Sequence, residues 1–150
     1  MALSKVQSES INLDDDFAGM HFGGTGSANQ LDDYETGTFT PTMAGSSGTI
    51  TSQSNTGEYV KIGNICMIHM VLTLTAKGSA SGTLSVSGLP FTSGTQRIPM
   101  VSRENANTGV MEHFTVNQDA TTGFLKARGG GNVTLANGDV RLVGGCYITT

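Results

Sequence analysis

Charged side chains are scarce in this sequence: Lys, Arg, Asp and Glu supply 13% of its 150 residues, against a usual share of roughly 25%. The net charge is −4 and no two Lys or Arg residues are adjacent, so we expect no nucleic-acid partner. No apolar run approaches the ~18 residues that cross a bilayer, so we expect no membrane insertion. The opening residues, MALSKVQS, lack the apolar core of a secretory signal, which predicts synthesis in a cytoplasm without a secretion tag.

Motifs for catalysis and metal binding are also missing from the sequence. There is no Gly-x-Ser-x-Gly nucleophile elbow, no Cys-x-x-Cys and no paired His spacing. We assign no chemistry to the isolated His21, His69 and His113. The acidic runs Asp14–Asp16 and Asp32–Asp33 lack the spaced ligand ladder of a calcium loop, so solvated charge or N-capping is favoured over Ca²⁺ binding. We therefore predict a protein that is not an enzyme, with no catalytic residue, no bound metal and no cofactor.

Cysteine is rare as well, with only Cys66 and Cys146, both inside apolar runs. In a protein made in the cytosol, buried reduced thiols are favoured over a disulfide. We therefore predict that both cysteines are buried, and whether they pair stays open.

Residues 1–30 differ in composition from the rest of the chain. Their apolar residues are scattered among polar and acidic ones, and the glycine-rich segment 23–27 resembles a flexible joint. This part cannot bury its own surface, which predicts an extended N-terminal arm that becomes ordered against a partner. The side chains that we expect to anchor the arm in a larger particle are Leu3, Val6, Ile11, Leu13 and Phe17.

Residues 31–150 alternate between apolar and polar positions, in short runs separated by Gly, Asn and Ser. This pattern predicts an all-β head domain built as an antiparallel sandwich or barrel. Tight turns are expected at Gly63-Asn64 and Asn137-Gly138, because Gly and Asn tolerate positive φ. The expected strands are 37–43, 48–53, 58–62, 64–76, 82–87, 98–103, 109–116, 122–127 and 139–149.

The segment 64–76 is the most informative of these, because both of its faces begin apolar. One face carries Cys66, Ile68, Met70, Leu72 and Leu74, and the other begins with Ile65, Met67, His69 and Val71. The last expected strand repeats this weakly, with Val140, Leu142, Cys146 and Ile148 on one face and Val143 and Tyr147 on the other. A doubly apolar strand needs a second cover, and large bare apolar patches are rare on monomers. Another subunit is the favoured cover, with a loop or the arm of the same chain as alternatives, and we predict that Ile65, Met67, His69 and Val71 form a subunit interface.

Three segments resemble motifs of a known family. Residues 31–42, LDDYETGTFTPT, are similar to an opening found in many tailed-phage fibre, spike and other virion proteins. Residues 57–64, GEYVKIGN, resemble the hairpin motif of the same family, and residues 87–91, SGLPF, resemble its turn motif. The sequence departs from the family at Phe39, where Trp is frequent, although an aromatic anchor is kept.

This resemblance implies a jelly-roll-like antiparallel β-sandwich head that forms a homotrimer and often contacts host-surface glycans. It predicts a bacteriophage virion structural protein, a short fibre or spike subunit on the virion surface, made in the bacterial cytoplasm and released by lysis. Its partners would be capsid or tail proteins of the same virion. The alternative is a capsid decoration or cement protein that binds no receptor, which the short arm of 30 residues favours over a full tail fibre. The receptor and its binding residues are unknown.

Overall fold

The computed structural model describes residues 20–21, 30–31 and 33–150 of the chain. The chain divides into two compact units, Met1–Asp33 and Tyr34–Thr150. In the first unit, β1 (Met20–His21) pairs antiparallel with β2 (Gln30–Leu31). The anchoring residues that we predict lie outside the described residues, so their role stays a prediction; they are Leu3, Val6, Ile11, Leu13 and Phe17.

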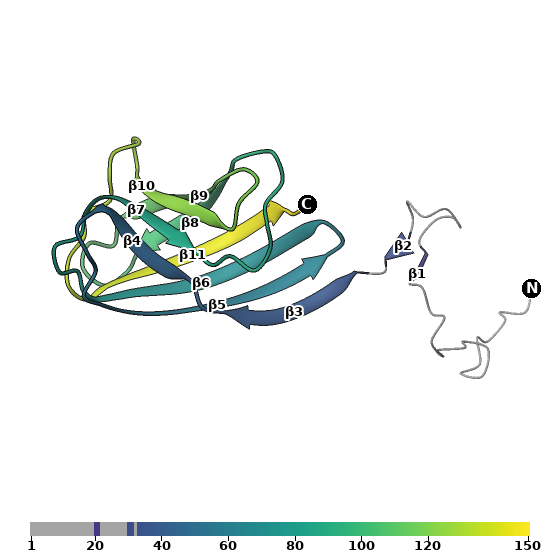
Figure 1. The fold of residues 1–150 in the computed structure, drawn as a ribbon, viewed down its shortest axis with the longest axis horizontal. Coiled ribbons are helices and arrows are strands. Elements are labelled where there is room, and N and C mark those ends of the chain that lie inside the picture. Colours follow the sequence, from purple (N-terminus) through teal and green to yellow (C-terminus); the bar gives the residue numbers. More distant parts are fainter. Residues whose placement is uncertain (1–19, 22–29, 32) are drawn as a thin grey trace, which may run out of the picture. The chain divides into compact units, whose positions relative to one another are not determined.

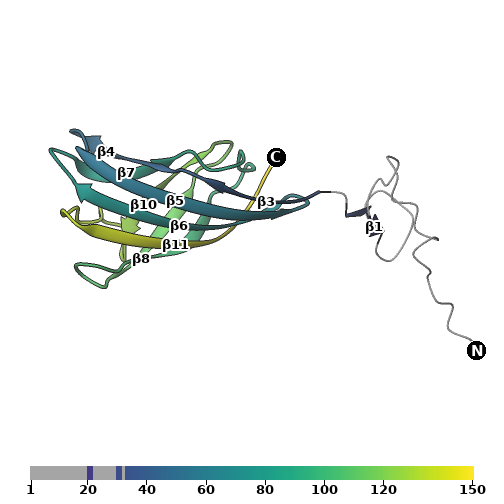
Figure 2. The ribbon, with the colours of Figure 1, turned by 90° about the horizontal axis from the view of Figure 1, so that it is seen from below.

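The second unit is all-β, and residues 33–150 contain no helix. Its strands are β3 (Tyr34–Phe39), β4 (Thr42–Ser47), β5 (Ser52–Ile62), β6 (Ile65–Ala76), β7 (Ser81–Ser87), β8 (Ile98–Glu104), β9 (Met111–Val116), β10 (Thr122–Ala127) and β11 (Asp139–Ile148). They form one nine-stranded antiparallel sheet in the order β3-β5-β6-β11-β8-β9-β10-β7-β4. The sheet curls, so that its inner face encloses a core (Figures 1 and 2).

Side-chain amides join the two ends of this curled sheet. The end strands β3 and β4 are separated in the chain only by Thr40–Pro41. From β5, the Gln53 side chain donates to the Met43 carbonyl oxygen (2.9 Å) and accepts from the Met43 amide (2.7 Å). The buried Asn55 side chain donates to the carbonyl oxygen of Pro41 (3.0 Å). These amides therefore take the place of strand pairing between β4 and β5.

The predicted bounds of two strands are wrong. The expected strand 37–43 is broken at Thr40–Pro41, where the chain passes from one end strand of the sheet to the other, and proline cannot donate to a ladder. The expected strand 48–53 is a connection over residues 48–51, because Gly48 has a φ of +72° and turns the chain after β4. The remaining seven predictions coincide with β5 to β11, although β5 begins well before the expected residue 58.

Both predicted turns are confirmed. Gly63 has a φ of +57°, and Ile62 pairs with Ile65 across the β5–β6 hairpin. Gly138 has a φ of +82° and lies just before β11. The alternation that we predict for residues 64–76 and for β11 is also confirmed, since the inward apolar side chains of both strands belong to the core. The core consists of Met43, Cys66, Ile68, Met70, Leu72, Leu74, Leu84, Val86, Leu89, Met100, Phe114, Val116, Leu125, Val133, Val143 and Tyr147.

The two cysteines lie on opposite faces of the sheet. Cys66 is fully buried, but Cys146 is exposed, so the prediction that both are buried is wrong. The cause is the register of β11: Tyr147 is the residue paired with Cys66 and takes the inner face, which turns Cys146 outward. Both thiols are free, and burial raises the pKa of the Cys66 thiol, which keeps it protonated.

Candidate functional site: the outer face of the sheet

The outer face of the sheet, defined by the outward side chains of β3, β5, β6, β11, β8 and β9, carries the residues that we assign to a subunit interface. Met67 is 55% exposed, Ile65 and His69 are exposed, and Val71 is half-buried. Their inward neighbours on β6 are fully or almost fully buried. The structure therefore brings Ile65, Met67, His69 and Val71 to one open face, and their contact with another subunit stays a prediction.

Strands β11, β8 and β9 extend this apolar surface. Backbone pairing sets Ile148 beside Ile65 and Cys146 beside Met67, at cross-strand spacing that allows side-chain contact. The most exposed apolar side chain of β8 is Val101, at 61%. Further large apolar side chains exposed on these strands are Leu142, Ile148 and Met111. The surface is thus wider than the interface that we predict from β6 alone.

Sequence reasoning missed the β8 and β9 part of this surface. The outward positions of β8 are Pro99, Val101 and Arg103, a pattern with one large apolar residue that carries no strong local signal. These residues join the surface only because β11 pairs with β6 on one side and with β8 on the other. That pairing order depends on long-range contacts and cannot be read from periodicity.

A groove of about 500 Å³ lies on the outer face over β3, β5 and β6. Its outward side chains are Thr36, Thr38, Glu58, Val60, Met67 and His69. Glu58 is directly opposite His69 in the β5–β6 pair, so a carboxylate and an imidazole lie side by side. Val60 and Met67 are likewise opposite each other and give the groove apolar contacts.

The three motifs that carry the family resemblance meet in one aromatic cluster. The Tyr59 ring packs edge-on against Phe91 (centroids 5.2 Å apart) and lies 6.4 Å from Phe39. Two motif glycines make room for these rings: a Cβ on Gly37 would come within 2.8 Å of Tyr59, and one on Gly57 within 2.5 Å of Phe39. The motifs therefore specify packing within the fold.

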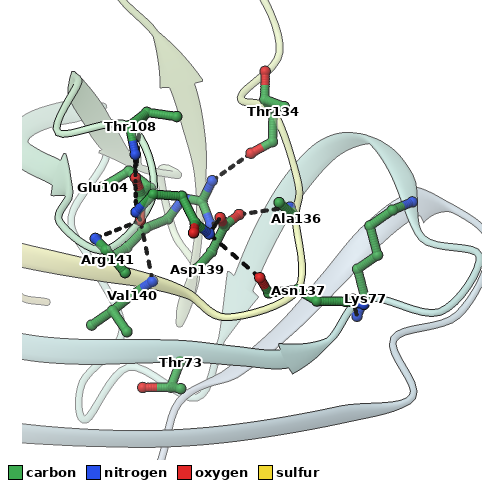
Figure 3. Close-up of polar contacts among 12 residues, drawn as sticks. Thr73, Lys77, Glu104, Thr108, Thr134, Ala136, Asn137, Asp139, Val140 and Arg141 are labelled. Carbon is green, nitrogen blue, oxygen red and sulfur yellow. Dashed lines mark hydrogen bonds and ion pairs between the residues drawn. The ribbon is translucent and has the colours of Figure 1, made fainter.

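A cluster of buried charges surrounds Arg141 on the inner face of β11 (Figure 3). The guanidinium is fully buried and donates to Glu112 (3.0 Å), to Asp139 (2.9 Å) and to the carbonyl oxygen of Thr134 (2.6 Å). Asp139 also accepts from the backbone amide of Ala136 (2.8 Å). Burial raises the pKa of Glu112, and the charge and hydrogen bond of Arg141 oppose this rise.

Glu104, at the end of β8, organises the following turn. Its carboxylate accepts hydrogen bonds from the backbone amides of Ala106, Asn107 and Thr108 and from the Thr108 hydroxyl (2.8 Å). Burial opposes ionisation of this carboxylate, but these hydrogen bonds lower its pKa from 4.5 to about 2. The Glu104 carboxylate is thus satisfied by the turn that it supports, and it is nearly inaccessible to solvent.

The histidines of the nine-stranded sheet lie on different strands. His113 is half-buried on β9, three steps across the sheet from His69 on β6, and His21 lies in β1 of the first unit. Within the described ranges, no three His, Cys, Asp or Glu side chains gather in a way that could hold a metal ion. The same part of the chain contains no helix long and apolar enough to span a bilayer.

No protein-family model matches this chain, and a search of curated proteins finds no significant match. The outer face of the curled sheet, with its apolar surface and its groove, is therefore the candidate site on the strength of its geometry.

Proposed function

We propose that this protein is a structural subunit on the surface of a tailed-phage virion, a short fibre or spike whose head self-associates as a homotrimer. One observation carries the proposal: the folded head leaves a broad apolar surface open across β6, β11, β8 and β9, including Met67 and Val101. Monomers rarely expose such a surface, so association of several copies is the simplest way to cover it. Residues 1–30 would anchor the subunit to capsid or tail proteins.

The finer architecture belongs to the same proposal. The curled sheet places β4, β7 and β10 across the core from β5 and β6, an arrangement that supports a sandwich-like head of jelly-roll type (Figure 1). The aromatic cluster of Phe39, Tyr59 and Phe91 supports the family resemblance, because its members come from all three motifs. The buried carboxylates around Arg141 are engaged in internal contacts, which supports a role other than catalysis.

Capsid decoration is the second candidate, and the scarcity of exposed aromatic side chains favours it. Sugar-binding sites commonly use an exposed aromatic ring, and Tyr34 is the one strongly exposed aromatic side chain among residues 33–150. A decoration protein needs no such platform. Copy number separates the candidates, because a few copies at one vertex indicate host attachment and hundreds over the shell indicate decoration.

The oligomeric mass of the full chain tests the proposal. Sedimentation velocity at micromolar concentration should give the mass of three copies, and Met67→Asp should shift the protein to monomer because a charge would be buried in the interface. Thr75→Asp, at an exposed outward position further along β6, is the matched control and should remain trimeric. A monodisperse wild-type monomer would refute self-association.

A separate experiment tests the anchor. Deletion of residues 1–22 should leave a folded, oligomeric head that no longer enters particles. Incorporation at the wild-type level would show that the arm is not the anchor.

A further inference from the structure

We propose that the heads associate head-to-tail in a closed ring, in which Arg103 of one copy binds beside Glu58 in the groove of the next copy. This inference rests on the self-association proposed above and adds which two surfaces meet. The groove over β3, β5 and β6 is one surface, and the exposed outward side chains of β8 and β9 form the other.

The first observation is charge. Among the outward side chains of β3, β5, β6, β11, β8 and β9, only Glu58 and Arg103 carry a formal charge at neutral pH. Both are exposed, and neither makes a hydrogen bond or ion pair within the part of the chain that the structure describes. Besides apolar, hydroxyl and imidazole groups, this face therefore has one free carboxylate and one free guanidinium.

The second observation is their separation. Glu58 is on β5 and Arg103 is on β8, with β6 and β11 between them. Three strand steps of about 4.8 Å each put the two positions about 14 Å apart across the sheet. The two charges thus lie on either side of β6 and β11, where each is placed to meet the other on a neighbouring copy.

The third observation is shape. Glu58 borders a groove with apolar contacts from Val60 and Met67. Arg103 is flanked by apolar side chains that protrude into solvent: Val101 lies two residues before it, and Met111 is paired with it across β8–β9. The apolar stem of an arginine packs well on such residues, and its guanidinium matches a carboxylate.

A two-fold dimer, in which the outer faces of two copies meet, would also set Glu58 against Arg103. Its packing at the centre of the face would be poorer than in a ring. In the register of the sheet, Gly144 lies between His69 and Val101. Its outward side is open, since an added Cβ would meet only the Ile68 carbonyl oxygen at 3.9 Å. A two-fold axis at β11 would place this notch against its own copy and leave a void, which close-packed interfaces avoid. In a ring, β11 faces the symmetry axis and the two flanks make the contact.

Charge reversal of the full chain tests the pairing. Glu58→Arg and Arg103→Glu should each raise the concentration at which the trimer dissociates by about tenfold or more, because like charges then face each other. The double variant should return to within a few-fold of wild type. Arg128→Glu, on an exposed turn, is the control and should leave the dissociation unchanged. Far-UV circular dichroism and a thermal melt establish that each variant is folded.

An equimolar mixture of the two single variants separates the ring from the two-fold pair. In a two-fold dimer, the mixed species restores both ion pairs, so association recovers fully. A ring of three must contain at least one junction between like copies, so the mixture should remain weaker than the double variant. Full recovery of the mixture would overturn the ring. A trimeric wild type whose double variant stays dissociated would overturn the pairing while self-association stands, and a monomeric wild type would overturn both.

Discussion

Replacing Arg141 by methionine removes the single cation of the buried cluster while keeping most of the side-chain volume. The carboxylates of Glu112 and Asp139 would lose partners at 3.0 and 2.9 Å, and the Thr134 carbonyl oxygen would lose a donor at 2.6 Å. Removing one partner of a buried ion pair destabilises a protein by about 3–5 kcal/mol, because the remaining charge stays buried. That is a large share of a typical domain stability of about 5–15 kcal/mol.

Urea unfolding followed by far-UV circular dichroism measures this loss. With a urea dependence of about 1–3 kcal/mol per molar, the midpoint should fall by about 2 M. All variants are compared at one protein concentration, since association adds to apparent stability. The matched control is Arg128→Met on an exposed turn, which should change the free energy of unfolding by less than about 0.5 kcal/mol.

A second variant distinguishes loss of charge compensation from loss of packing. Adding Glu112→Gln and Asp139→Asn to Arg141→Met should recover part of the stability, because neutral amides leave no uncompensated charge. A loss below about 1 kcal/mol in the single variant would show that the cluster does not hold the fold in this way. A triple variant no more stable than the single one would assign the loss to packing alone.

The other predictions concern the titration of Glu104, the hydrogen bonds of Gln53 between β4 and β5, and the close approach of Gly57 to Phe39. Because the pKa of Glu104 is about 2 in the fold against 4.5 unfolded, its ionised form should contribute about 3 kcal/mol above pH 4.5, lost as the pH falls toward 2. Glu104→Gln should flatten this slope in urea midpoints measured between pH 5.5 and pH 3; an unchanged slope would contradict the assignment. Gln53→Ala should destabilise the head by about 2 kcal/mol and speed hydrogen exchange at the Met43 amide, whose partner it removes; unaltered exchange would argue against closure by this amide. Gly57→Ala should lower the melting temperature, because the new Cβ would lie 2.5 Å from the Phe39 ring, and an unchanged melt would show that the ring can move.

Local patterns in the sequence predict those parts of the fold that depend on local chemistry. The alternation along residues 64–76 places Met70 inward and Met67 outward, as the structure does, because successive strand residues point to opposite faces. The Gly63 turn is equally local, since its φ of +57° suits glycine. The break at Pro41 was accessible in principle, because proline cannot donate to a ladder, but the apolar alternation on both sides of it masks the signal.

The candidate site depends on long-range pairing and could be predicted only in part. Val101 joins the apolar surface through β11, and Arg141 meets Glu112 from a different strand. The spacing of these residues in the sequence does not predict that they come together. The exposure of Cys146 has the same origin, since it follows from the register that gives the inner position to Tyr147.

The placement of the few charged residues connects the fold to the proposed association. The chain has few charged residues, and three of them are almost fully buried in the head: Arg141, Glu104 and Asp139. The outer face then has one carboxylate and one guanidinium, those of Glu58 and Arg103, on an apolar surface. Apolar contacts alone are non-directional and would allow several registers between copies. A register that leaves Glu58 and Arg103 unpaired is less favourable than one that pairs them. These two residues would therefore select one arrangement among those that the apolar surface stabilises.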